Sequence, residues 1–322
     1  MSVVIKTNIT SLIVQKNLNS ATNALQTSME RMTTGFRINH ASDNAANYSI
    51  SNAMVTKLSS LEVVTDNATM GKDLLSTAED NNNLISTHLS RIRDLTEQAA
   101  NGTYGSTSLK AIQSEIKSRL QEISRIAENA EFNGIKLMSS EGRLTNGIDL
   151  QVGLDSTNNS IINLPSTLFA NSTVNGLFKS DSALMTIVTA ANGGTAIDNL
   201  NTDEGYTAVA AAFSGLKKVG GKFVIQTEAA YKPAKTLSSI DAAINTLSNR
   251  NTTLGAAENR LDSAIDALGA QTQNLTSSLS TVRDTDVAAE SSAYIQAQIL
   301  QQASATLLAT ANQMPSVALN LI

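Results

Sequence analysis

The stretch IDAAINTLSNRNTTLGAAENRLDSAIDALGAQTQNLTSSLSTV, residues 240–282, decides the fold of this chain. Its large apolar residues recur in steps of four, three and seven, as in a heptad repeat along one face of a long helix. A lone helix cannot bury such a seam, so the rest of the chain must supply partner helices. The seam consists of Ile240, Ile244, Leu247, Leu254, Leu261, Ile265, Leu268, Leu275, Leu279 and Val282.

The pattern after this stretch changes but remains helical. No Gly follows Gly269, and Pro315 is the only late proline. Nothing therefore interrupts a helix for about forty-five residues, a length of roughly 60 Å. The apolar and alanine positions of this C-terminal arm are Ile295, Ile299, Ala303, Leu307, Ala311 and Met314.

Residues 1–34 contain neither Gly nor Pro, and their apolar residues also follow a helical face. This N-terminal arm is basic, whereas the C-terminal arm has no Lys or Arg after Arg283. Opposite charges favour pairing of the arms, although exposed ion pairs contribute only about 0–1 kcal/mol each. Two separately solvated faces are the alternative interpretation. The positions that define the N-terminal face are Leu18, Leu25, Met29, Met32 and Phe36.

The middle of the chain predicts two further helices and a β-hairpin. Helical spacing runs from Ile50 to about residue 101 and again from Leu109 to about residue 129. Alternating residues at 148–152 and 161–164, separated by turn residues, predict a hairpin. Between Pro165 and Pro233 the helical seams are short, Gly is frequent and residues 222–227 resemble a strand. We interpret residues 166–236 as a compact, exposed, mixed α/β insertion, with a candidate helix at 209–216.

The predicted fold is therefore mainly α. It is a long coiled-coil or helical-bundle rod formed by paired N- and C-terminal regions, with a β-hairpin region and a small insertion. We divide the chain into an N-terminal helical arm (1–44), a rod domain (45–165), the outer insertion (166–236), a returning rod helix (237–285) and a C-terminal helical arm (286–322).

The composition argues against several classes of protein. There are no cysteines, only two histidines, and no phosphate-binding or zinc-protease motif. We expect no enzyme activity, no cofactor and no metal. A net charge of −5 argues against nucleic acid, and no apolar run approaches the length of a membrane span. The N-terminal residues show no cleavable signal peptide.

Several segments resemble bacterial flagellin, the subunit of the flagellar filament. At the N-terminal side these are residues 32–47 (MTTGFRINHASDNAAN) and 89–104 (LSRIRDLTEQAANGTY). The segments EFNGIKLM at 131–138 and DLQVG at 149–153 are similar to the family's hairpin region. At the C-terminal side they are 254–268 (LGAAENRLDSAIDAL) and 297–322 (AQILQQASATLLATANQMPSVALNLI). Nothing comparable covers residues 166–236.

The resemblance implies a homopolymer of many copies, in which the arms line the inner tube and the insertion faces outward. It implies a secreted protein of the bacterial flagellum, exported through the flagellar type III apparatus. A cytoplasmic export chaperone, the filament cap and the hook-junction proteins are the expected partners. The subunit interfaces would use the arm positions given above.

The resemblance also aligns Arg91, Leu95 and Glu115 with the patch that the flagellin-sensing Toll-like receptor of the host recognises. All three residue types are retained, whereas Asp94, Thr96 and Glu97 depart from the family pattern. Packing between helices is the alternative role: Arg91 would pair with Asp94, and Leu95 would continue the apolar seam.

Two other functions stay open at the level of sequence. The hook–filament junction protein shares flagellin-like ends. An adhesive binding module could instead be carried by residues 166–236, beside a filament role or in place of it.

Overall fold

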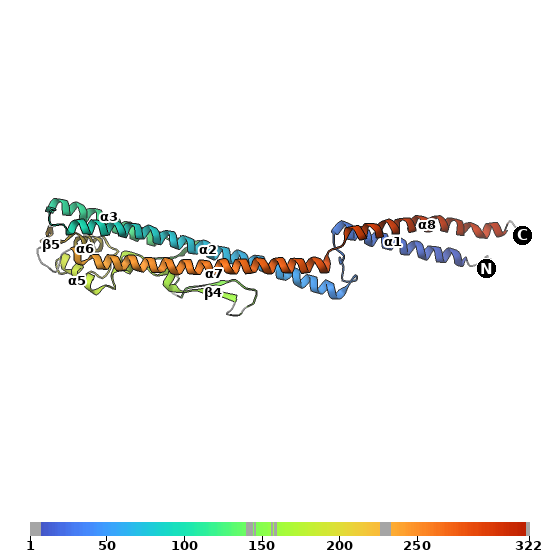
Figure 1. Cartoon of the computed structure of the whole chain (residues 1–322), viewed down its shortest axis with the longest axis horizontal. Helices are drawn as coiled ribbons and strands as arrows, with labels where there is room; N and C mark the ends of the chain where they lie inside the picture. Colours follow the sequence, from blue (N-terminus) through green and yellow to red (C-terminus); the bar gives the residue numbers. More distant parts are fainter. Residues whose placement is uncertain are drawn as a thin grey trace. The chain divides into compact units, whose positions relative to one another are not determined.

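The computed structural model describes residues 8–139, 144, 146–155, 157, 160–225 and 233–319, with side chains up to residue 313. The described chain is mainly helical, as predicted, and its strands form three two-stranded antiparallel sheets (Figure 1). Contacts divide the chain into two compact units. The first unit is Met1–Ser60 with Gly269–Ile322, and the second is Leu61–Leu268. The long helices α2 (Ala45–Ala100) and α7 (Leu237–Arg283) each contribute to both units.

The first unit is built on α1 (Ile9–Thr34) and α8 (Val287–Leu319), which pack against each other. Asn8 starts α1, because its side chain accepts a hydrogen bond from the Ser11 N–H at 3.1 Å. Gly35 ends it at φ 73°, a left-handed conformation that glycine adopts without strain. Asp286 starts α8 by accepting from the N–H groups of Ala288 and Ala289. Local capping residues therefore set where α1 begins and ends and where α8 begins.

The second unit is a bundle of α2, α3 (Ser106–Asn129) and α7. Every seventh position of α7 from Ile240 to Leu268 is buried, and the half-buried Ile244 and Ile265 lie at the edges of this seam. Two ion pairs between α2 and α7 set their antiparallel register. Lys72 meets Asp262 at 2.7 Å and Arg93 meets Asp241 at 2.7 Å.

Two hairpins follow α3 in the chain. The first pairs β1 (Glu131–Phe132) with β2 (Ile135–Lys136), and the second pairs β3 (Ile148–Gln151) with β4 (Ile161–Leu164) in the predicted segments. Leu150 of β3 approaches α2 at Gly71, where an added Cβ would lie 2.4 Å from a Leu150 methyl group. This close approach explains why a residue that weakens a helix interior stands at position 71.

The insertion has its own small fold. Its elements are the 3-10 helix η2 (Ser166–Phe169), α4 (Val174–Phe178), α5 (Ser182–Ala191), α6 (Asp203–Ser214), β5 (Leu216–Val219), β6 (Lys222–Ile225) and the 3-10 helix η4 (Pro233–Lys235). Of the predicted strand at 222–227, residues 222–225 form β6, and residues 226 and 227 lie outside the described residues. The predicted helix at 209–216 begins earlier, because the Thr202 hydroxyl caps it at Gly205 N–H.

The insertion packs against the three-helix bundle and is not attached to it through its two ends alone. Helix α6 packs against α3, and Phe213 of α6 is fully buried in a T-shaped contact with Phe178, 5.7 Å between ring centroids. Ser124 of α3 accepts from the Val174 N–H at 3.3 Å. The hydrophobic core of the second unit therefore runs from the three-helix bundle into the insertion.

Candidate assembly and recognition surfaces

The inner seam between α1 and α8 is lined by small side chains. Ala21 and Ser28 of α1 are buried there, as are Ala297, Ser304 and Ala311 of α8. Leu18 and Leu25 are half-buried on the same face of α1. The α8 positions follow heptad steps of seven, so the two helices pair as a short coiled coil with little bulk between their backbones.

Polar contacts fix the antiparallel register of this pair. At one end the Asn8 side-chain amide donates to the Ala311 carbonyl at 2.7 Å. In the middle Gln301 Nε2 donates to Thr22 Oγ1 at 3.2 Å. At the other end Arg31 lies 3.8 Å from Glu290. Among the described residues of the two arms this is the one ion pair between them, so there the predicted charge asymmetry makes a small contribution to pairing.

The segment after α1 is fastened to the segment before α8. The Arg37 N–H donates to the Arg283 carbonyl at 2.6 Å, and the Thr285 N–H donates to the Gly35 carbonyl at 3.0 Å. The Arg283 guanidinium lies over the Phe36 ring, 3.9 Å from its centroid, which is cation–π geometry. The two loops thus form a bridge that closes the α1–α8 pair at this end.

The large apolar side chains of both arms lie on the outside of this pair. On α8, Ile299 is 60% exposed and Ile295 and Leu307 are similar. On α1, Met29 and Met32 are exposed as well. Of the predicted arm positions, Leu18, Leu25 and Ala311 face the inner seam, and Phe36 lies in the bridge. Met314 lies in α8, but its side chain is outside the described residues. Among the side chains that the structure describes on these two helices, the exposed large apolar residues are Ile9, Leu12, Ile13, Met29, Met32, Val287, Ile295, Ile299, Leu300 and Leu307.

The three residues aligned with the receptor patch lie on α2 and α3 of the second unit. Arg91 is exposed, and its Nε donates to Glu115 Oε1 at 3.3 Å. The predicted pairing of Arg91 with Asp94 is wrong, because α3 places Glu115 nearer than the next turn of α2. Leu95 is only 2% exposed and packs in the core. Of the three side chains, Arg91 and Glu115 offer surface to a partner.

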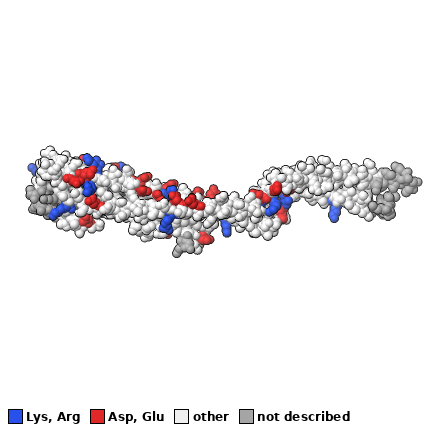
Figure 2. Space-filling model, viewed as in Figure 1, with Lys and Arg blue, Asp and Glu red and all other residues white. Residues whose placement is uncertain are grey.

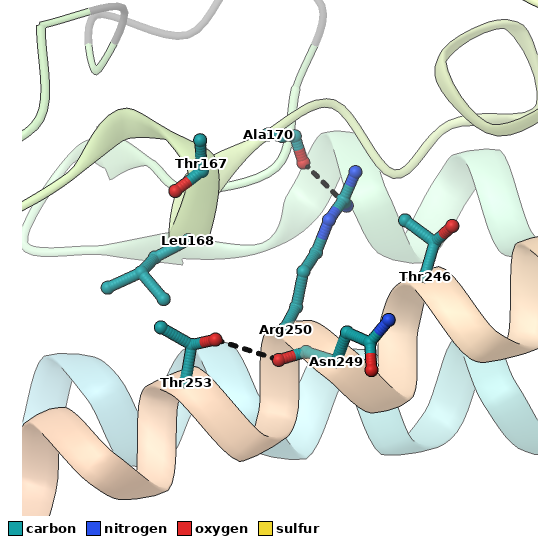
Figure 3. A pocket seen from close by; sticks show the side chains of 7 residues that line it. All are labelled: Thr167, Leu168, Ala170, Thr246, Asn249, Arg250 and Thr253. Atoms are coloured by element: carbon teal, nitrogen blue, oxygen red, sulfur yellow. Dashed lines mark hydrogen bonds between the residues drawn. The ribbon is translucent and has the colours of Figure 1, made fainter.

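A hollow of about 380 Å³ lies between the start of the insertion and α7 (Figure 3). Arg250 rises from α7 beside it and donates through Nη1 to the Ala170 carbonyl at 3.1 Å and to Ser172 Oγ at 2.7 Å. Burial lowers the pKa of this guanidinium, and both of its acceptors are neutral. These two bonds hold the chain that follows η2 against α7, which is a structural role that sequence periodicity did not indicate.

His88 and Glu258 are half-buried titratable groups of the bundle. Burial, and then the nearby Arg119, lower the pKa of His88, whose Nδ1 has no hydrogen-bond partner among the described residues. Burial, and then Glu79, raise the pKa of Glu258. Within the part of the chain that the structure describes, no group of acidic or histidine side chains could hold a metal ion. None of the described helices is long and apolar enough to cross a membrane.

These features define a mainly helical structural protein with an apolar outer surface on its paired ends. Comparison with known families agrees. Residues 5–142 match the bacterial flagellin N-terminal helical region, and residues 237–322 match the bacterial flagellin C-terminal helical region. The chain belongs to the bacterial flagellin family, a family of structural proteins and not of enzymes. A role as a subunit of the flagellar filament follows from this membership.

Full-length relatives support the same conclusion. Flagellin D of Vibrio anguillarum is 32% identical over 379 residues, and polar flagellin B/D of Vibrio parahaemolyticus is 30% identical over 377 residues. Each comparison covers 100% of both chains.

Among solved structures, a putative flagellar hook-associated protein from Vibrio parahaemolyticus covers 75% of this chain and 100% of its own, with a TM-score of 0.55 and 15% identity. That likeness concerns the fold alone. Bacillus cereus flagellin covers 66% of this chain and 94% of its own at 21% identity, with a TM-score of 0.39.

Proposed function

We propose that this chain polymerises into the filament by burying the outer apolar faces of α1 and α8 against neighbouring copies. The observation that carries the proposal is the exposure of ten large apolar side chains on two helices that already pack against each other through Leu18, Leu25 and buried Ala and Ser residues. Three of them, Ile295, Ile299 and Leu300, line one hollow on α8, and exposed apolar patches on soluble proteins commonly mark sites of protein association.

The energetics favour this mode of assembly. Burying the exposed half of an aliphatic side chain stabilises a contact by about 1 kcal/mol. Several such side chains from each copy can therefore offset the loss of freedom on association. Contacts between different faces of successive copies generate an open helical polymer when the rotation between copies does not close into a ring.

The test is growth from short filament seeds, followed by electron microscopy. Ile299→Asp places a charge in the centre of the outer face and should abolish elongation. Gln298→Asp is the matched control, because it adds the same charge at an exposed polar position of the same helix. Equal growth of both variants and of the unmodified chain would refute the role of the outer face.

The division of labour along the chain is part of the proposal. The arms 1–44 and 286–322 form the inner core of the filament, and residues 45–165 with 237–285 form the rod. Residues 166–236 form the outer part of the subunit. The pairing of α1 with α8 in one compact unit supports the first assignment.

We also assign export through the flagellar type III apparatus and an extracellular location, with an export chaperone, the filament cap and the hook-junction proteins as partners. The matches to both flagellin end regions support this assignment. Secretion should stop when the export apparatus is disabled and should continue when only the general secretion pathway is blocked. The reverse result would contradict it.

A second role, recognition by the flagellin-sensing Toll-like receptor, is favoured by the surface that the exposed Arg91 and the half-buried Glu115 offer. In this conformation Leu95 would act by packing beneath them, since it is buried. Arg91→Ala should weaken receptor binding, measured with purified receptor ectodomain. Lys110→Ala, which removes an exposed charge from α3, should not. Unchanged affinity for Arg91→Ala beside measurable binding of the unmodified chain would exclude this role.

A further inference from the structure

Polar side chains pair across one edge of the α2–α7 interface. Lys72 of α2 meets Asp262 of α7 at 2.7 Å. Farther along, Asn251 Nδ2 of α7 donates to Asn83 Oδ1 of α2 at 2.6 Å. The two pairs are separated by the same number of residues on both helices, and the second ion pair between α2 and α7 continues this register. Each position on this edge therefore has a defined position opposite it, and we call two opposite positions a rung.

Glu258 of α7 interrupts this series of complementary rungs. The register places Glu258 opposite Ser76 of α2. One turn of α2 to one side is Lys72, which already pairs with Asp262, and one turn to the other side is Glu79. The Oε1 atom of Glu258 has essentially no exposed surface and no hydrogen-bond partner among the described residues. A buried polar oxygen of this kind costs free energy until a donor reaches it.

The charged groups around Glu258 are mostly acidic. Figure 2 shows acidic side chains gathered over this part of α2 and α7. Burial, and then the carboxylate of Glu79, raise the pKa of Glu258 above its ordinary value, whereas Lys72 lowers it. The folded chain therefore takes up a proton at Glu258 at a higher pH than the unfolded chain does. Among the described residues, the charged groups that act on Glu258 are Glu79, Lys72 and Asp80 of α2 and Asp262 of its own helix.

We propose that Glu258 and Glu79 form a proton-binding pair that strengthens the α2–α7 interface in acid. Uptake of one proton removes one of the two negative charges, and the O–H group that forms donates to the carboxylate that remains. This hydrogen bond gives the Glu258 carboxyl group the partner that it lacks in the ionised state. Because the pair lies within the second unit of one copy, it acts whether or not the chain polymerises.

The pH dependence of this pair has the opposite sign to that of His88. Folding raises the pKa of Glu258, so its contribution to stability is present in acid and is lost as the pH rises through the folded pKa. Folding lowers the pKa of His88, so protonation of His88 destabilises the folded chain. A comparison of two chains that both contain His88 cancels the histidine contribution at each pH.

Thermal unfolding of Glu258→Gln and of the unmodified chain, followed by circular dichroism, tests the pair. Glutamine has the shape of a protonated glutamate and carries no charge. At about pH 7.5 the Tm of Glu258→Gln should therefore exceed that of the unmodified chain by about 2–4 °C. The difference should shrink to less than half as the pH falls to about 5, because the unmodified chain then carries the proton. Glu79→Gln removes the nearest source of repulsion and should show the same convergence in Tm.

Controls separate the proton-binding pair from a general effect of charge. Asp266→Asn also converts a carboxylate to an amide, at an exposed position two turns farther along α7, and its Tm should follow that of the unmodified chain at every pH. A difference in Tm between Glu258→Gln and the unmodified chain that is equal at both pH values would overturn the proposal. So would a Glu79→Gln chain that behaves like Asp266→Asn.

A bound metal ion is the competing explanation for two facing carboxylates. The titrations contain a chelator, and a parallel series contains calcium instead. If calcium raises the Tm of the unmodified chain at about pH 7.5 but not that of Glu258→Gln, the carboxylates hold a metal ion and the proposal is wrong. Equal Tm values with chelator and with calcium are the expected result.

Discussion

Replacing Asn82 with Leu should stabilise the second unit. Asn82 has no exposed surface and lies on the core face of α2 between Ala78 and Ile85, which are also fully buried. Neither its Oδ1 nor its Nδ2 has a hydrogen-bond partner among the described residues. A buried polar group without a partner has given up its hydrogen bonds to water and costs about 1–3 kcal/mol.

The expected magnitude follows from three contributions. Removal of the amide recovers about 1–3 kcal/mol, and Leu gains a few tenths of a kcal/mol in helix propensity over Asn. The larger Leu side chain must be accommodated, which costs up to about 1.5 kcal/mol in a packed core. The net gain in the free energy of unfolding is about 1–2 kcal/mol. For a unit of this size that corresponds to about 2–8 °C in Tm.

Urea unfolding followed by circular dichroism measures the change. Asn259→Leu, at an exposed position of α7, makes the same change of residue type without releasing a buried amide and should stay within about 0.5 kcal/mol of the unmodified chain. Asn82→Asp buries a charge and should be strongly destabilising. If Asn82→Leu lowers the free energy of unfolding by more than 1 kcal/mol, the amide makes stabilising contacts and the reasoning is refuted.

Three further perturbations follow from the same structure. Gly147→Ala should lower the free energy of unfolding by about 1–3 kcal/mol, because φ is +80° and the Leu164 carbonyl oxygen would lie 2.3 Å from the new Cβ. In the same urea titration Gly255→Ala, whose new Cβ would have no atom within 4 Å, should raise it by about 0.5–1 kcal/mol. Lowering the pH through about 6.5 should lower the free energy of unfolding, because the unfolded state takes up a proton at His88 at a higher pH than the folded state does. His88→Gln should make the free energy of unfolding depend less on pH in this range. Phe213→Ala should lower the free energy of unfolding by about 3–5 kcal/mol and expose the insertion to limited proteolysis, whereas an unaltered cleavage pattern would contradict its place in a shared core.

The segments with a long apolar period could be predicted from sequence. The buried positions of α7 could be predicted because a heptad repeat of apolar residues packs against a partner helix. The hairpin of β3 and β4 was predicted from alternation and turn residues. The family resemblance rested on several segments in the same order as in flagellin, and the chain belongs to that family.

The direction in which each arm's apolar residues point could not be predicted from sequence. Ile295, Ile299 and Leu307 form a helical pattern that looks like a seam, yet α1 packs on the alanine and serine positions beside them. Small residues allow two helix backbones to approach closely. The spacing of the large apolar residues alone does not predict that the helices pack through the small ones. The burial of Leu95 and the pairing of Arg91 with Glu115 were equally hidden, because both depend on where α3 lies against α2.

The sequence by itself determined that this chain is helical at both ends and to which family it belongs. These properties follow from local spacing, caps and long collinear motifs, which are written in neighbouring residues. Only the tertiary structure decided which side of each arm remains uncovered and that the insertion shares the core of the bundle. Those properties depend on contacts between residues far apart in the chain, and no local pattern specifies them.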